Sequence, residues 1–152
     1  MPTCKECDNE VETLVSVKVD GKAKKLCEDC ADRVRESAEI AVAGLTEQQA
    51  KEKGVDVKIG KFPFAALGRA MAVNETDGFF KIVADKKTHE VLGIHIVGPE
   101  ASNLISEGAL ALEMHAFLED IGMTIHPHPT LGEGMMEANL NGLGQAVHIM
   151  NR

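Results

Sequence analysis

The chain has 152 residues, 44% of them hydrophobic, which leaves room for one ordinary domain or for one domain with a small metal-stabilised module. Its net charge of −8 and its 3% aromatic content argue against nucleic-acid binding, which favours a basic surface and stacking platforms. No apolar run reaches the roughly 18 residues of a membrane helix and the N-terminus is polar, so we expect a cytoplasmic protein without membrane contact.

The first 38 residues predict a small module built on a hairpin. Residues 12–19 are rich in β-branched side chains and predict a strand, Asp20-Gly21 predicts a tight turn, and residues 22–26 predict the returning strand. After this hairpin, residues 31–42 predict a helix with one apolar face.

All four cysteines of the chain lie in this module, with the spacing C-x2-C-x19-C-x2-C. Two such pairs on either side of a hairpin predict a closed, structural zinc site with Cys4, Cys7, Cys27 and Cys30 as ligands. A redox role for one CxxC pair is the competing interpretation, but the βαβ pattern that such a motif requires is missing. Iron in the same thiolate cage stays open. We expect the module to bind a protein partner.

Residues 39–150 predict a second domain. Helices are predicted at residues 45–54, with Thr46 as N-cap and Gly54 as stop, and at residues 102–115 and 134–143. Strands are predicted at residues 55–64, 79–84 and 90–97, the last two as a hairpin. The predicted fold class is therefore α+β: an antiparallel sheet with flanking helices, preceded by a zinc-ribbon-like hairpin module at residues 1–38.

The helix at residues 102–115 has small and apolar residues on one face, which predicts close packing against another helix or sheet. We expect self-association to use this face together with the last helix, the alternative being that the same residues fill the core of a monomer. The residues concerned are Leu104, Ile105, Gly108, Ala109 and Leu112, with Met135 and Met136.

Residues 126–133, HPHPTLGE, carry the other chemically rich motif. It resembles the His-x-His-Pro-Thr-Leu-x-Glu motif in the C-terminal dimerisation domain of the dihydrolipoamide dehydrogenase family of flavin-dependent disulfide oxidoreductases. The resemblance continues from about residue 39 to residue 139. Further matching segments are GLTEQQA at residues 44–50, GKFPF at 60–64, GRA at 68–70, NETDGF at 74–79 and LGIHIVGP at 92–99.

This resemblance implies that His128 is the family's catalytic acid/base and that Glu133 orients its ring. An imidazole with a pKa near 6.5 suits proton exchange with a dithiol at neutral pH. In the family this histidine reaches across a homodimer to the partner's flavin and redox disulfide, and the bond corresponding to His128–Pro129 is cis. The alternative is that Glu133 is the carboxylate of a Thr130 capping box and His128 a packed loop residue.

The other histidines have no metal-ligand spacing with one another. We expect a structural role for His126, a satisfied strand position for His95, and loop, helix-surface and tail positions for His89, His115 and His148 respectively.

The sequence contains neither C-x4-C nor G-x-G-x-x-G between a strand and a helix, which the enzyme uses for its redox disulfide and its nucleotides. The family's first strand, ahead of the helix at residues 45–54, also has no predicted counterpart. We therefore expect no catalysis by this chain alone, with FAD and NAD present only if a partner subunit binds them. The leading hypothesis is a homodimeric interaction scaffold with a structural zinc module. The alternatives are an accessory subunit that lends the His–Glu pair to a split flavoprotein, and a zinc-ribbon regulator associated with transcription; a fragment or fusion product also stays open.

Overall fold

The computed structural model describes residues 2–5, 7–19, 22–31 and 39–151. The chain divides into two compact units, Met1–Ala38 and Glu39–Arg152. Each unit has a cluster of buried apolar side chains of its own. Among the described residues, no helix is both long and apolar enough to cross a lipid bilayer.

A two-stranded hairpin forms the N-terminal unit. Strand β1 (Val15–Val19) runs antiparallel to β2 (Lys22–Leu26), with Val15 opposite Leu26. The predicted strand pairing is therefore confirmed, whereas the predicted Asp20-Gly21 turn lies outside the described residues.

The core of this unit is small. Its buried members are Cys4, Leu26, Cys30 and Ala31, and Leu14 and Val15 pack against them. Chains of fewer than about 40 residues bury too little apolar surface to fold without a disulfide, a metal or a partner. A cross-link through the cysteines is therefore the expected source of the missing stability.

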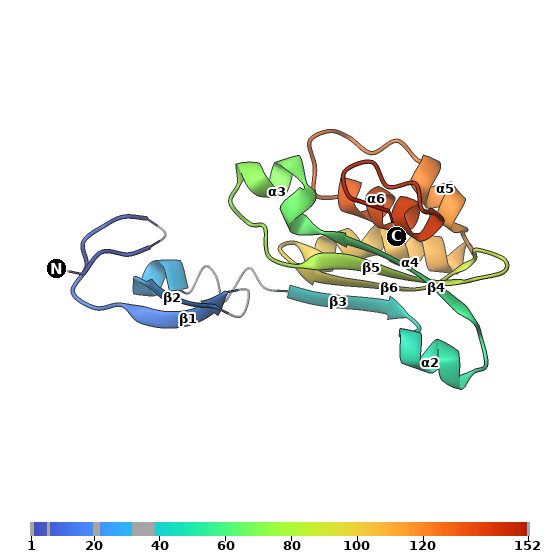
Figure 1. Cartoon of the computed structure of the whole chain (residues 1–152), viewed down its shortest axis with the longest axis horizontal. Helices are drawn as coiled ribbons and strands as arrows, with labels where there is room; N and C mark the ends of the chain where they lie inside the picture. The colour runs from blue at the N-terminus through green and yellow to red at the C-terminus, as the bar shows by residue number, and fades with distance from the viewer. Residues whose placement is uncertain (1, 6, 20–21, 32–38, 152) are drawn as a thin grey trace. The chain divides into compact units, whose positions relative to one another are not determined.

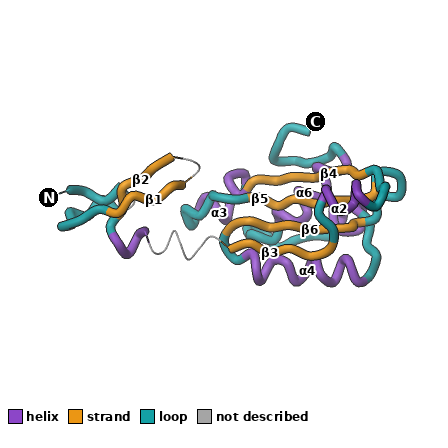
Figure 2. The backbone as a smooth tube through the Cα atoms, turned by 90° about the horizontal axis from the view of Figure 1, so that it is seen from below, coloured by secondary structure: helices purple, strands orange, loops and turns teal. Residues whose placement is uncertain are grey.

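The second unit is built on a four-stranded antiparallel sheet, seen with its strands side by side in Figure 2. The strands are β3 (Glu39–Gly44), β4 (Val57–Pro63), β5 (Phe79–Asp85) and β6 (Val91–Gly98). Their order across the sheet is β3-β6-β5-β4, which places the predicted β5–β6 hairpin at the centre, with Ile82 opposite Ile94. Strands β5 and β6 therefore each have a hydrogen-bonded neighbour on both sides.

Strand β3 corrects two predictions. The helix predicted over residues 31–42 is wrong from residue 39 onward, and the strand expected to be missing ahead of the helix at 45–54 is present, paired with β6. Ala31 is helical, and residues 32–38 lie outside the described ones. Exposed Ile40 and Val42 alternate with half-buried Ala41 and Ala43, which is the two-residue period of a strand. Pairing with β6 outweighs the small helix preference of the alanines.

The helices form layers on the sheet. They are α2 (Glu47–Glu52), the 3-10 helix η1 (Phe64–Ala66), α3 (Gly68–Ala72), α4 (Ala101–Glu113), α5 (Leu118–Met123) and α6 (Glu133–Leu143). Figure 1 shows α4, α5 and α6 on one face of the sheet and α2 beyond the other. Helix α4 covers β3 and β6, whereas α6 covers β4 and β5. The α+β class is confirmed; the sequence patterns did not predict α3 or α5.

Helix α2 begins where the sequence predicts. The Thr46 hydroxyl accepts the Gln49 N–H at 3.1 Å, and the Gln49 side chain accepts the Thr46 N–H at 2.9 Å, which is a complete capping box. Gly54 follows the helix with φ +77°, a conformation that a residue with a Cβ rarely adopts.

Glycines let α6 approach the sheet to main-chain contact. A Cβ on Gly60 of β4 would lie 2.0 Å from the Ala138 carbonyl oxygen, and one on Gly134 would lie 2.2 Å from the Phe80 ring. The Phe80 ring is itself stacked on that of Phe64, with centroids 4.8 Å apart. These contacts therefore fix how far α6 lies from the sheet and where the helix begins, after the loop that contains the motif histidine.

Candidate functional site

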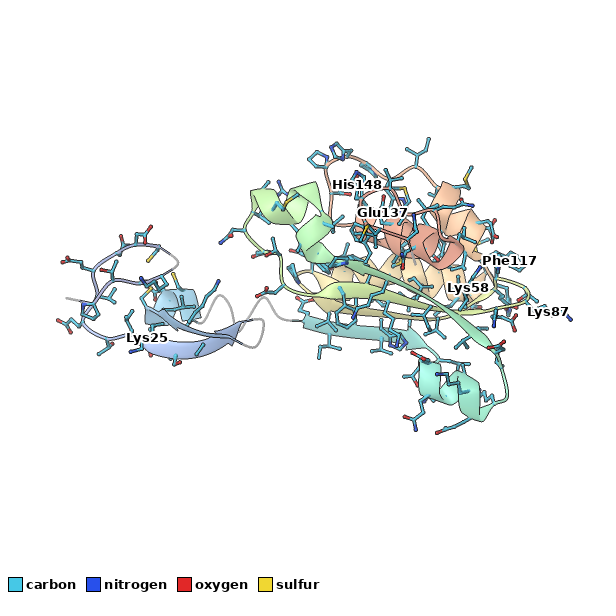
Figure 3. The ribbon with its side chains drawn as sticks, in the orientation of Figure 1. Lys25, Lys58, Lys87, Phe117, Glu137 and His148 are labelled. Carbon is cyan, nitrogen blue, oxygen red and sulfur yellow. The ribbon has the colours of Figure 1, made fainter. Side chains whose placement is uncertain are left out.

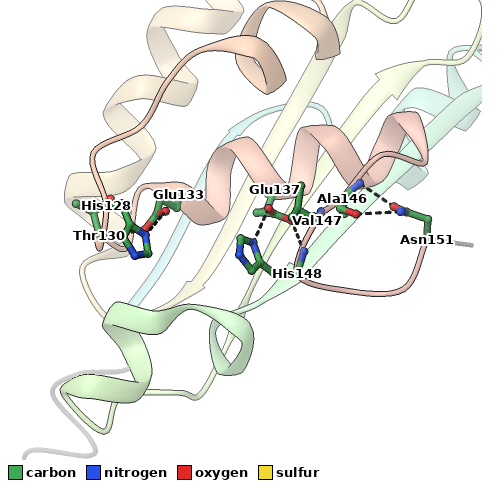
Figure 4. A network of polar contacts seen from close by, with 8 residues as sticks. All are labelled: His128, Thr130, Glu133, Glu137, Ala146, Val147, His148 and Asn151. Atoms are coloured by element: carbon green, nitrogen blue, oxygen red, sulfur yellow. Dashed lines mark hydrogen bonds and ion pairs between the residues drawn. The ribbon is translucent and has the colours of Figure 1, made fainter.

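His128 and Glu133 lie together where the loop after α5 enters α6 (Figure 4). His128 Nδ1 is 2.8 Å from Glu133 Oε1, and the His128–Pro129 peptide bond is cis, as the resemblance predicts. The His128 side chain is 74% exposed and that of Glu133 only 13%. The Glu133 carboxylate is therefore largely enclosed by the protein, and it orients the His128 ring, which faces solvent.

Glu133 has a second bond that ties it to the helix start. Its Oε2 accepts the Thr130 N–H at 2.8 Å. The other half of the predicted capping box is wrong, because the Thr130 hydroxyl donates to the Pro127 carbonyl at 2.8 Å and the N-cap is Gly132. The hydroxyl thus closes the loop ahead of the helix instead of capping it.

The charge state of this pair follows from its contacts. Desolvation acts to raise the pKa of Glu133, but hydrogen bonds from the Thr130 main chain and the His128 ring outweigh it, and the pKa lies below its ordinary value. An ionised carboxylate only accepts, so His128 Nδ1 carries the hydrogen and Nε2 is left to take up or release a proton. The pair can exchange one proton with a group that approaches from solvent.

A second histidine–glutamate pair lies one helical turn further along α6 (Figures 3 and 4). Glu137 is 1% exposed, and its Oε1 is 2.8 Å from His148 Nδ1. Its Oε2 accepts the main-chain N–H groups of Val147 at 3.0 Å and His148 at 3.3 Å. The buried carboxylate therefore anchors the C-terminal segment to α6.

Sequence reasoning missed this second pair and placed His148 in a tail. The one local signal is the four-residue spacing of Glu133 and Glu137, which puts both on one face of α6. The segment also closes on itself, since the Asn151 side chain accepts the Ala146 N–H at 2.8 Å and donates to the Ala146 carbonyl at 3.0 Å. The Glu137–His148 contact joins residues 11 apart in sequence, which is too far for a search for local motifs.

The four cysteines form the other candidate site. Their sulfur atoms all lie within 4.8 Å of one another, and those of Cys7 and Cys27 are 3.9 Å apart. With Zn–S bonds of about 2.3 Å, the sulfurs of a tetrahedral site are separated by about 3.8 Å. The predicted ligands are thus brought together at a spacing that suits this metal.

The two CxxC pairs have different local structures. The first lies in a turn, in which the Asp8 N–H donates to the Cys4 carbonyl at 3.1 Å, and the second lies at the start of a helical turn, in which the Ala31 N–H donates to the Cys27 carbonyl at 2.8 Å. The Cys27 N–H also donates to Cys4 Sγ at 3.2 Å, which ties the second pair to the first. A hydrogen bond from the Asn9 main chain lowers the pKa of Cys7, but the Cys4 thiol and desolvation outweigh it, and the pKa is raised.

Comparison with known proteins identifies the family of the larger unit. Residues 33–139 match the family model described as the pyridine nucleotide-disulphide oxidoreductase, dimerisation domain. The chain belongs to this family. The match includes β3, the corner after β4 and the motif at residues 126–133.

Curated relatives of this dimerisation domain are dihydrolipoyl dehydrogenases. The domain is 53% identical over 114 residues to that of Thermus scotoductus, covering 75% of this chain and 25% of the relative. It is 54% identical over 114 residues to that of Haloferax volcanii, covering 75% of this chain and 24% of the relative. The chain therefore spans about a quarter of the length of the curated relatives it matches.

Solved structures of flavoprotein reductases share the fold. LpdA from Mycobacterium tuberculosis has a TM-score of 0.63 and 27% identity, over 67% of this chain and 22% of LpdA. The HOCl-induced flavoprotein disulfide reductase RclA from Escherichia coli has a TM-score of 0.63 and 27% identity, over 66% of this chain and 23% of RclA. These likenesses support the assignment of the sheet and its helices to the family's dimerisation domain.

The remaining histidines of the dimerisation domain all have partners. His126 has a side chain only 7% exposed, and it contacts the Thr124 carbonyl and Glu107 Oε1, each at 2.9 Å. Half-buried His95 has Nε2 3.1 Å from the Leu45 carbonyl. The ion pairs His89–Glu119 and His115–Glu90 complete the set. These contacts fit the structural roles predicted for His126 and His95.

The predicted self-association face of this domain is wrong in most of its members. Leu104, Ile105 and Leu112 pack against the core, Gly108 lies against Ile94, and Met135 is 1% exposed. The reason is that the apolar row of α4 faces its own sheet. Large apolar side chains are exposed on the opposite side: Leu110 of α4 is 61% exposed, and Met114, the C-cap of α4, is 71% exposed.

Proposed function

We propose that the chain is a homodimeric interaction protein, in which a dihydrolipoyl-dehydrogenase-like dimerisation domain carries a small structural zinc module. The observation that carries this proposal is the match of residues 33–139 to a dimerisation domain, whose four-stranded sheet and core here lie within residues 39–151. Dimerisation then displays two zinc modules on one assembly. The net charge of −8 favours a protein over a nucleic acid as their partner.

The donor set supports zinc in the module. Four thiols at tetrahedral spacing leave no open coordination position, so the metal is structural and performs no catalysis. Iron takes the same four sulfurs, so a metal analysis decides between them. Zinc also supplies the cross-link that the small core requires.

Self-association is supported by apolar side chains left exposed on the helix layer. Leu110 lies on α4 and Met114, four residues later, is the C-cap of that helix; Phe117, three residues after Met114, is 43% exposed. Large apolar residues next to one another on a surface mark a contact site. We place the dimer contact on this patch of Leu110, Met114 and Phe117.

Native mass spectrometry of the purified chain tests the proposal. The expected result is a dimer with one zinc per chain. Leu110→Glu should give a monomer that still carries zinc, because the change buries a charge in the dimer contact. Met71→Glu is the matched control and should stay a dimer, because Met71 is also a large apolar residue, 57% exposed, and lies on α3 outside the patch. A monomeric parent chain contradicts the scaffold.

A second function is favoured by the geometry of His128. Its ring is exposed, oriented by Glu133, and free at Nε2, as an acid/base that serves another chain needs to be. In this alternative the chain is an accessory subunit of a split flavoprotein whose own domains bind FAD and NAD. His128→Gln then abolishes the gain in lipoamide-dependent activity that the chain gives to the partner. An unchanged gain excludes this role.

A further inference from the structure

Two of the four cysteines are buried and two are half-buried, and each CxxC pair contains one of each kind. Cys4 is 0% exposed and Cys30 is 2% exposed, whereas Cys7 and Cys27 are half-buried. Each pair thus has one buried and one half-buried cysteine. The two half-buried residues belong to different pairs, and their sulfur atoms lie 3.9 Å apart.

We propose that the zinc module is a peroxide-responsive site, in which oxidation joins Cys7 to Cys27 and releases the metal. This inference rests on the proposed zinc site. A disulfide within either CxxC pair is what the sequence spacing alone favours. The structure favours a link across the pairs, because a small oxidant reaches Cys7 and Cys27 before the buried Cys4 and Cys30.

The chemistry balances with hydrogen peroxide as the oxidant. As a metal ligand Cys7 is a thiolate, although its pKa in the metal-free site is raised. It attacks one peroxide oxygen, the O–O bond breaks, and a sulfenic acid and hydroxide result. The Cys27 thiolate then attacks the Cys7 sulfur, which forms the S–S bond and expels a second hydroxide. Two protons convert both hydroxides to water, so two thiolates, one peroxide and two protons give one disulfide and two waters. The roles of the two sulfurs can be exchanged without changing the product.

Loss of two thiolates leaves the metal with Cys4 and Cys30 as its remaining protein ligands. A structural zinc site needs four ligands to close its shell, so the ion leaves. Cys4 is further protected, since its sulfur accepts the Cys27 N–H at 3.2 Å and it lies in a core with Leu26. The disulfide therefore forms on the accessible side of the site.

The experiment uses the full zinc-loaded chain. Native mass spectrometry before oxidation counts the metal; a chain purified without zinc refutes the metal site itself. Peroxide is then added, zinc release is followed with a chromogenic chelator, and tryptic peptides are mapped without reduction. The expected product links residues 6–18 to residues 26–33. Cleavage after Glu28 separates the two cysteines of the second peptide and should place the link on Cys27.

A link between residues 1–5 and 6–18, or one confined to residues 26–33, overturns the inference while leaving the zinc site intact. Zinc retention under excess peroxide overturns it as well. Two variants form a matched pair, since each removes one ligand from the same CxxC: Cys7→Ser should slow peroxide-driven release at least about fivefold, and Cys4→Ser should not slow it. If either variant fails to bind zinc, the peptide map of the parent chain decides.

Discussion

The contact between β4 and α6 gives a direct test of how the site is held. Gly60→Ala places a Cβ 2.0 Å from the Ala138 carbonyl oxygen and 2.9 Å from the Gly142 nitrogen. Ordinary contact begins near 3.4 Å, so the first distance is more than 1 Å too short. Both neighbours are main-chain atoms and cannot rotate away, so the whole helix must move from the sheet.

The expected loss of unfolding free energy is about 3 kcal/mol or more. Overpacking of a tight contact costs about 1–3 kcal/mol, at the upper end where backbone has to shift. A displaced α6 also breaks the 3.0 Å bond from the Lys61 N–H to the Asn141 side chain, worth about 1 kcal/mol.

The chain has no Trp or Tyr, so urea unfolding is best followed by far-ultraviolet circular dichroism. Gly68→Ala is the matched control: no atom of the described residues lies within 4 Å of its added Cβ, and at the start of α3 it should stabilise by about 0–1 kcal/mol. If Gly60→Ala unfolds within about 1 kcal/mol of the parent, close backbone contact does not set the position of α6, and the reasoning fails.

Three further predictions concern other parts of the chain. Removal of metal with a chelator should abolish the ordered signal of the N-terminal unit and leave the unfolding midpoint of the dimerisation domain unchanged; a shift of that midpoint would show that the units are coupled. Lys51 and Lys81 lower the pKa of Glu47 from 4.5 to about 2, so Glu47 stabilises the fold above pH 4.5 and this contribution is lost as the pH falls toward 2. Lys81→Met should remove roughly 0.5–1 kcal/mol of it, seen as a smaller difference in urea stability between about pH 5 and about pH 3; an unchanged difference contradicts the assignment. Glu137→Leu leaves the Val147 and His148 N–H groups without their acceptor and should cost about 2–4 kcal/mol, with early proteolysis of the C-terminal segment; full protease resistance would argue against the anchor.

Local chemistry was the part of the fold that the sequence made predictable. The β5–β6 hairpin and the Thr46 cap each depend on a few neighbouring residues with strong preferences, whereas the cis bond at His128–Pro129 was expected from the family resemblance. The cysteine spacing likewise anticipates which four sulfurs meet. None of these needs knowledge of the tertiary structure.

Tertiary pairing decided what the sequence did not predict. Residues 39–44 contain alanines that suit a helix, and only the partner strand β6 makes them a strand. The apolar row of α4 has the same pattern whether it faces a sheet or a second subunit, so periodicity alone left open the side that packs inward. The Glu137–His148 pair joins positions 11 residues apart, across the end of α6 and the loop that follows it.

Glu133 binds two parts of the protein at once, the main chain of Thr130 and the ring of His128. The first of these bonds helps to start α6, so natural selection for folding is enough to preserve the carboxylate, whatever becomes of the chemistry at the ring. A descendant chain that has no further use for proton exchange therefore inherits an assembled imidazole–carboxylate pair. The presence of this motif in a sequence is therefore evidence for the fold, and it is not by itself evidence for an active enzyme.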